Sequence, residues 1–86
     1  MFHVIAVEYA GDKKLDISFD DGNSGVIDLS GHLIGPVFEP LQRNDEFAKV
    51  VLDEELETVV WPNGADFAPE FLRDLLFKQN PNKRSA

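Results

Sequence analysis

Residues 59–72, VVWPNGADFAPEFL, contain the single tryptophan of the chain and join a predicted strand to a predicted helix. Val59 and Val60 are β-branched, which favours a strand. The turn Pro62-Asn63-Gly64 is typical of a tight reversal, because proline fixes its φ angle while asparagine and glycine tolerate positive φ. Pro69 suits the first position of a helix, where no backbone N–H is needed. The stretch therefore predicts a strand, a turn and a helix in close succession.

Two interpretations of this corner remain open. In the structural one, Trp61 packs the helix against the sheet and donates its indole N–H to a carbonyl, while Asp66 accepts backbone N–H groups from the turn or from the start of the helix. In the functional one, Trp61, Asn63 and Asp66 form a small-ligand pocket. Loops often carry binding residues, but a turn so fully specified by its own residues needs no ligand. The structural interpretation is therefore favoured.

The C-terminal helix is predicted over residues 69–77. At 100° per residue its core-facing side consists of Phe71, Leu72, Leu75 and Leu76. Phe77 points nearly the opposite way. Either it is exposed as a docking point for a partner, or the helix ends one residue earlier and Phe77 folds back over the core. Residues 79–86 have no apolar face, so we expect a flexible tail after a single domain spanning 1–78.

The N-terminal half predicts three antiparallel strands. Residues 4–9 are apolar on both faces, which is typical of a central strand covered on both sides. Residues 15–19 alternate apolar with polar side chains, as in a strand buried on one face. The turn DDGN at 20–23 favours a hairpin. A three-residue loop over 21–23 keeps the apolar side chains on one face, so we expect that register.

This register sets Leu15 opposite Leu29 and makes Asp16 and Asp28 direct cross-strand neighbours, although like charges there are unfavourable. Together the two carboxylates could hold a divalent cation through oxygen ligands. They could equally be solvated side chains on the outer face of the sheet. Calcium takes six or more oxygen ligands, so the solvated interpretation is favoured.

Shorter elements follow. Glycine and proline exclude a long helix between residues 30 and 44. We predict a helical turn near 30–34, an extended stretch over 35–41, and a short helix over 45–49 capped by Asn44. Three side chains of the extended stretch are expected to reach the core: Val37, Phe38 and Leu41.

A second hairpin is predicted to pair residues 50–52 with 58–61 across the acidic turn 53–55. The predicted fold class is therefore α+β. A small antiparallel sheet, made of a three-stranded meander plus this second hairpin, packs against a short middle helix and the C-terminal helix. The 86 residues suffice for one domain.

Charge and composition exclude several classes of protein. Sixteen acidic and eight basic residues give a net charge of −8, which repels a phosphate backbone and argues against direct nucleic-acid binding. The absence of cysteine excludes disulfides and thiolate–zinc sites. No apolar window approaches the roughly 18 residues of a membrane helix, and the N-terminus lacks a signal-peptide pattern. We expect a cytoplasmic protein with no membrane association.

No residue pattern predicts an enzyme. His3 and His32 have no cysteine and no second histidine at zinc-site spacing. A Ser/His/Asp set can be assembled from Ser30, His32 and Asp28, but no nucleophile-elbow sequence accompanies it. We therefore expect no catalytic residue, no cofactor and no bound metal.

Three stretches of the chain resemble a known family. ISFDDGNSGVIDLS (17–30), LIGPVFEPLQRNDEFAKVVLDEE (33–55) and VVWPNGADFAPEFLRDL (59–75) are similar to the short bacterial proteins catalogued as domain of unknown function 2442. The resemblance runs from about Val4 to Leu76 and implies a small α+β domain. Some longer relatives carry a DNA-binding helix-turn-helix, and others look like neighbours of small proteins in a toxin–antitoxin-like layout. The segment after the helix is too short for a helix-turn-helix, so DNA binding is not expected here.

These observations favour a non-enzymatic interaction domain that binds a protein partner, or a second copy of itself, through a sheet edge or a helix surface. The charge favours a basic partner, and an antitoxin-like or regulatory role is one concrete form. The alternative is a small-ligand or cation sensor that uses Trp61, Asn63 and Asp66.

Overall fold

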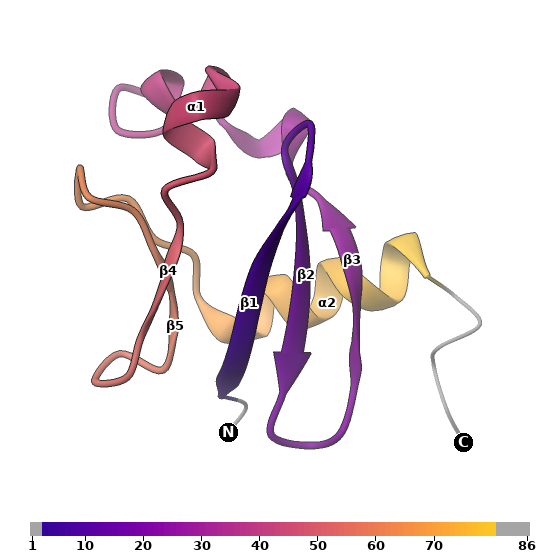
Figure 1. The fold of residues 1–86 in the computed structure, drawn as a ribbon. Helices are drawn as coiled ribbons and strands as arrows, with labels where there is room; N and C mark the ends of the chain where they lie inside the picture. Colours follow the sequence, from indigo (N-terminus) through magenta and orange to yellow (C-terminus); the bar gives the residue numbers. More distant parts are fainter. Residues whose placement is uncertain (1–2, 81–86) are drawn as a thin grey trace.

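The first sheet of the computed structural model, which describes residues 3–80, consists of three antiparallel strands. These are β1 (Val4–Gly11), β2 (Lys14–Phe19) and β3 (Ser24–Asp28), in the order β1-β2-β3. The long helix α2 (Pro69–Gln79) crosses one face of the sheet (Figure 1). Within residues 3–80, no helix covers the opposite face of the sheet (Figure 1).

The second sheet is the hairpin of β4 (Val51–Asp53) and β5 (Thr58–Val60). Between the sheets the chain forms two 3-10 turns, η1 (Ser30–His32) and η2 (Glu39–Gln42), and the short helix α1 (Asn44–Phe47). The predicted α+β class, with its three-stranded meander, second hairpin and C-terminal helix, is confirmed. None of the helices within residues 3–80 has the length and apolar character needed to cross a bilayer.

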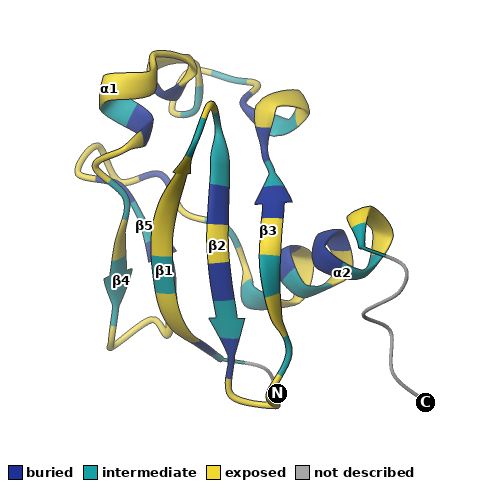
Figure 2. Cartoon of the chain, turned by 45° about the vertical axis from the view of Figure 1, so that its right-hand side comes forward, coloured by how far each residue is buried: buried dark blue, intermediate teal, exposed yellow. Residues whose placement is uncertain are grey.

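The core lies between the first sheet and α2. β2 shows the predicted alternation, since its odd-numbered side chains are buried while Asp16 is exposed (Figure 2). Apolar side chains from both sheets, the connecting turns and α2 complete this core. The buried side chains exposed by no more than 1% are Leu15, Ile17, Phe19, Ile27, Leu29, Leu33, Phe47, Val59, Ala65, Leu72 and Leu76.

β1 is an edge strand of its sheet, so the prediction of a central strand covered on both sides is wrong. Ile5 is 57% exposed, and most of β1 faces solvent (Figure 2). An apolar run indicates that the side chains of a strand are covered by other residues. It does not indicate whether a neighbouring strand pairs with one edge or with both edges. Here the β4–β5 turn meets the start of β1. The Val4 N–H donates to the Glu57 carbonyl (3.0 Å), and His3 Nδ1 lies 2.9 Å from Glu57 Oε2.

The β2–β3 hairpin differs from its predicted register by two residues. Leu15 pairs with Ile27 rather than with Leu29, because the three-residue loop starts one residue earlier than predicted, at Asp20. Gly22 has a φ of +90°, the left-handed conformation that closes such a loop, and it therefore occupies the last loop position. A shift of two residues leaves each side chain on its predicted face, since strand side chains alternate with a period of two.

The middle of the chain is more helical than predicted. η2 replaces part of the expected extended stretch, and the N–H groups of Phe38 and Glu39 both donate to the carbonyl of Gly35. Leu41 is buried and Phe38 is half-buried, as predicted, whereas Val37 is 41% exposed. The prediction that Asn44 caps the short helix is wrong. Its Oδ1 instead accepts a hydrogen bond from Lys13 Nζ (2.7 Å).

α2 continues two residues beyond the predicted end, through Gln79. The Gln79 side-chain amide accepts from the Asp28 N–H (2.7 Å) and donates to the Asp28 carbonyl (2.9 Å), as a neighbouring strand would. Asn80 Nδ2 donates to the Val26 carbonyl of the same strand edge (3.1 Å). Two residues assigned to the predicted tail thus hold the edge of β3. The remainder of that tail, residues 81–86, lies outside the described residues.

Candidate interaction surface

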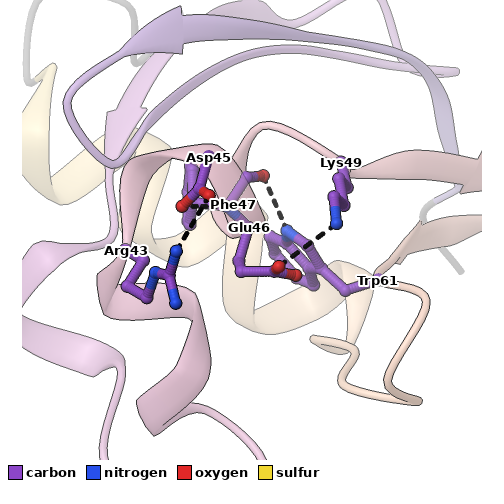
Figure 3. A network of polar contacts seen from close by, with 6 residues as sticks. All are labelled: Arg43, Asp45, Glu46, Phe47, Lys49 and Trp61. Atoms are coloured by element: carbon purple, nitrogen blue, oxygen red, sulfur yellow. Dashed lines mark hydrogen bonds and ion pairs between the residues drawn. The ribbon is translucent and has the colours of Figure 1, made fainter.

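Trp61 is buried at the corner between β5 and α2, as the structural interpretation predicted. Its side chain is 2% exposed, and its indole N–H donates to the Phe47 carbonyl over 2.8 Å (Figure 3). Two exposed ion pairs of the α1 region lie beside this bond: Arg43–Asp45 and Lys49–Glu46 (Figure 3). Such exposed pairs contribute little to stability. The buried indole bond is therefore the polar contact that fixes α1 to the corner.

Asn63 holds the turn together. Its Oδ1 accepts the N–H of Ala65 (3.1 Å), and its Nδ2 donates to the carbonyl of Val37 (2.8 Å) on the neighbouring loop. The Gly64 N–H donates to the Trp61 carbonyl (2.9 Å), with Gly64 at a φ of +93°, which glycine adopts readily. The bonding role that the sequence suggested for Asp66 thus belongs to Asn63, whose amide can donate and accept at once.

Asp66 is exposed and caps nothing, so its predicted capping role is wrong. Residue 66 contributes a backbone bridge to Val60, and the N-cap position of α2 is Ala68, which makes no side-chain cap bond. Within residues 3–80, no hydrogen bond or ion pair engages the Asp66 carboxylate. Pro69 at the first helical position removes one N–H that would otherwise need a cap.

The three residues of the predicted ligand pocket do not converge. The Trp61 indole is buried and hydrogen-bonded, both ends of the Asn63 amide are occupied, and Asp66 faces solvent. In the part of the chain that the structure describes, no pocket opens and no buried side-chain polar atom lacks a hydrogen-bond partner. A ligand could therefore contact this corner only at its outer surface.

Phe77 is half-buried on α2 because a neighbouring side chain covers it. Arg73 Cζ lies 4.5 Å from the centre of the Phe77 ring, a cation–π arrangement. Arg73 Nε also donates to Asp21 Oδ2 of the β2–β3 loop (2.8 Å). Partial burial opposes ionisation of Asp21, but hydrogen bonds from Asn23 and Arg73 outweigh it and lower the pKa of Asp21. Phe77 neither stands free nor folds back past the end of the helix.

Asp16 and Asp28 are not cross-strand neighbours. Asp16 pairs with Val26 and Asp28 with Lys14, so the predicted like-charge contact is absent. Hydrogen bonds from the backbone and side chain of Ser30 lower the pKa of Asp28. Ser30 therefore bonds to the carboxylate rather than to a histidine, which is not the order of a catalytic triad. No cluster of three potential metal ligands occurs among the residues that the structure describes.

Four partly buried rings beside Trp61 contact one another in succession. Phe38 stacks on Phe67 (ring centres 4.8 Å apart), Phe67 stacks on Phe71 (5.3 Å), and His32 meets the edge of Phe71 (5.3 Å). We call these four side chains the aromatic row. They come from η1, from the loop before η2, and from the start of α2 and the residues before it. Sequence periodicity within a single element cannot reveal such a set.

The aromatic row is only partly buried. Phe71 was predicted to face the core but is 36% exposed, while Phe38 and Phe67 are half-buried. Two exposed aliphatic residues lie on the loop that joins His32 to Phe38: Ile34 is 76% exposed and Val37 is 41% exposed. We call the aromatic row together with Ile34 and Val37 the interaction surface.

Two hydrogen bonds, one part-buried and one exposed, hold the backbone of the interaction surface. The Thr58 hydroxyl donates to the Phe67 carbonyl (2.6 Å), and the Asn63 amide donates to the Val37 carbonyl (2.8 Å). Stacking joins Phe38 to Phe67, so loop and helix start form one connected face. Such a face requires little ordering on binding, which lowers the entropic cost of association.

The interaction surface has acidic surroundings. Neither segment that supplies it, 29–42 or 59–72, contains a lysine or arginine. Each phenylalanine of the aromatic row has an exposed acidic residue beside it in the chain: Glu39, Asp66 and Glu70. Neighbouring Cα atoms are about 3.8 Å apart, so these carboxylates lie within roughly one Debye length of the rings. The surface therefore combines apolar contacts with a negative rim.

Comparison with known proteins gives one match. The model of a family described as "Protein of unknown function (DUF2442)" matches residues 4–77, which is most of the chain. No curated protein and no solved structure matches the chain.

Proposed function

The chain belongs to the DUF2442 family of proteins of unknown function, and we propose that it is a non-enzymatic interaction module. In this proposal the domain binds a protein partner in the bacterial cytoplasm through the interaction surface. Affinity comes from covering the aromatic row and Ile34, and the net charge of −8 favours a basic partner.

The partial exposure of the aromatic row supports this proposal. Ile34 is 76% exposed, the highest value among the exposed large hydrophobic side chains of residues 3–80, and Phe71 is 36% exposed. Contiguous exposed apolar surface marks interaction sites in soluble proteins, and aromatic side chains are enriched among residues that dominate binding energy. The predicted docking point, Phe77, supports binding less, because Arg73 already covers its ring.

Binding through the edge of β3 receives less support than binding through the interaction surface. A partner strand needs free backbone N–H and C=O groups along a sheet edge. The Gln79 and Asn80 side chains already occupy such groups of Asp28 and Val26. A strand could pair there only after displacing the end of α2, which would break these bonds.

An antitoxin-like role is one concrete form of this proposal. A small acidic domain with an exposed apolar face is suited to covering a basic surface on another protein. The alternative, a small-ligand or cation sensor at Trp61, Asn63 and Asp66, stays a prediction. No contact at that corner favours it, because the indole and the amide already bond within the fold.

Affinity recovery from the native cell tests the proposed function. The tagged chain is compared with Ile34→Ser and with the control Leu56→Ser, whose aliphatic side chain is 56% exposed on the β4–β5 turn and is not part of the interaction surface. We expect the wild type and Leu56→Ser to recover the same partner at low salt, and Ile34→Ser to lose it. Equal recovery by all three forms, or a lone monomer from the wild type, would contradict the proposal.

A further inference from the structure

We infer that the element recognised by the interaction surface is a basic amphipathic helix of the partner, with apolar side chains one turn apart and lysine or arginine beside them. This inference rests on the proposed function, because it names the partner element for the same surface. It is carried by two independent features, the spacing of the rings and the distribution of charge.

The spacing of the rings matches a helix better than a strand. Successive ring centres are 5.3, 5.3 and 4.8 Å apart along His32, Phe71, Phe67 and Phe38. Side chains one turn apart on a helix have Cβ atoms about 5–6 Å apart. Side chains on one face of a strand repeat every ~6.5–7 Å.

This difference accumulates along the aromatic row. Over the three intervals between four rings, a strand moves out of register by roughly 4–5 Å, which is nearly a full ring spacing. Over the same three intervals, a helix with apolar residues at positions i, i+4, i+7 and i+11 stays in register within about 2 Å. The aromatic row is therefore complementary to the apolar stripe of a helix, as in grooves that bind amphipathic helices.

The acidic residues around the aromatic row determine which side chains should flank the apolar stripe of the partner helix. Glu39, Asp66 and Glu70 adjoin the aromatic row, and no lysine or arginine occurs in either segment that supplies it. The Asp66 carboxylate has no bonded partner within residues 3–80, so it is available to a cation of the partner. An acidic or neutral helix would gain the apolar contacts but not the electrostatic attraction to the acidic residues. A second copy of this chain also carries a net charge of −8, so the two copies would repel each other.

Three synthetic peptides test the inference on the isotope-labelled full chain by NMR. The first is an 18-residue peptide of leucine and lysine, with the leucines at helical spacing. The second has the same composition, with leucine and lysine alternating as in a strand. The third keeps the helical spacing but replaces each lysine with glutamate. Each is titrated into the wild type, Ile34→Ser and Leu56→Ser, and thermal unfolding confirms that both variants are folded.

The inference predicts that the basic helical peptide shifts the amide signals of residues 32–38 and 65–71. Ile34→Ser should weaken this binding by about tenfold, and Leu56→Ser should leave it unchanged. Tighter binding of the alternating peptide at these residues would identify an extended partner and overturn the helix. Equal binding of the glutamate peptide would overturn the charge requirement.

Failure of this inference is distinguishable from failure of the proposed function. If no peptide binds at the interaction surface while the partner from the cell still depends on Ile34, the basic helix is wrong and the interaction module stands. If the cell partner does not depend on Ile34, the proposed function fails whatever the peptides do.

Discussion

The aliphatic layer between the first sheet and α2 is closed to water, whereas the aromatic layer next to it is partly open. The aliphatic layer consists of Leu15, Ile17, Ile27, Leu72 and Leu76, each 0% exposed. The aromatic layer contains buried Phe47 and Trp61 and, outside them, the half-exposed aromatic row. One chain thus assigns folding and association to two different layers. The closed layer stabilises the fold, and the open layer remains available for association.

Truncating the closed layer should have the largest effect. Leu72→Ala removes a side chain that is 0% exposed, and we expect it to lower the free energy of unfolding by about 3 kcal/mol. A chain of this size has only about 5 kcal/mol in total, so the variant should be marginally folded at room temperature. Urea unfolding followed by circular dichroism measures this. A loss below about 1 kcal/mol would mean that the aliphatic layer does not dominate stability.

The inner part of the aromatic layer should come next. Trp61→Phe keeps a ring in place but removes the indole N–H and leaves the Phe47 carbonyl without that bond. We expect a loss of about 2 kcal/mol, because the buried indole bond is lost and the smaller ring leaves a cavity, while the Phe47 carbonyl keeps a longer bond from the Val50 N–H (3.3 Å). The same urea experiment tests it, followed by circular dichroism since the tryptophan is gone. An unchanged midpoint would show that water replaces the indole without cost.

A smaller effect distinguishes the two polar residues of the corner. Asn63→Ala removes bonds to Ala65 and Val37 and should cost about 1 kcal/mol. Asp66→Ala removes an exposed carboxylate that bonds to nothing in residues 3–80, so we expect a change within about 0.5 kcal/mol. Each variant is the control for the other. The opposite ranking would restore the capping role first predicted for Asp66.

The smallest effect concerns the link between α2 and the β2–β3 loop. Because the folded-state pKa of Asp21 is lowered, ionised Asp21 stabilises the fold above its unfolded pKa of about 3.9. This contribution is lost as pH falls through the folded pKa. Below about pH 4, the stability of wild type should therefore decline more steeply than that of Asp21→Asn. Parallel urea unfolding curves at a series of pH values measure the two slopes, and identical slopes would contradict the assignment.

The sequence predicts the closed layer well because regular elements build it. Alternation in residues 15–19 and helical spacing in residues 72–76 place the buried side chains correctly. The predicted register of the hairpin was wrong by two residues. The prediction matched apolar residues across the two strands, whereas the left-handed conformation of Gly22 fixes the position of the loop. The edge position of β1 was missed, because apolar content does not show which strands are neighbours.

The open layer could not be predicted in the same way. Its four rings come from separate segments and meet only after the chain folds. The periodicity of a single helix or strand therefore does not relate them to one another. Trp61 was recognisable from its size and position, and its bond to a carbonyl was predicted correctly. The choice between Asn63 and Asp66 required geometry, since both residue types favour turns for the same chemical reason.

The most direct test of this account is an NMR map of the labelled chain bound to the partner recovered from the cell. We predict that shifts will concentrate on residues 32–38 and 65–71, with the amides of β2 nearly unchanged. Shifts centred on the uncovered face of the first sheet, with Ile34 and Phe71 unaffected, would show that the aromatic row is only part of the fold and would contradict the account.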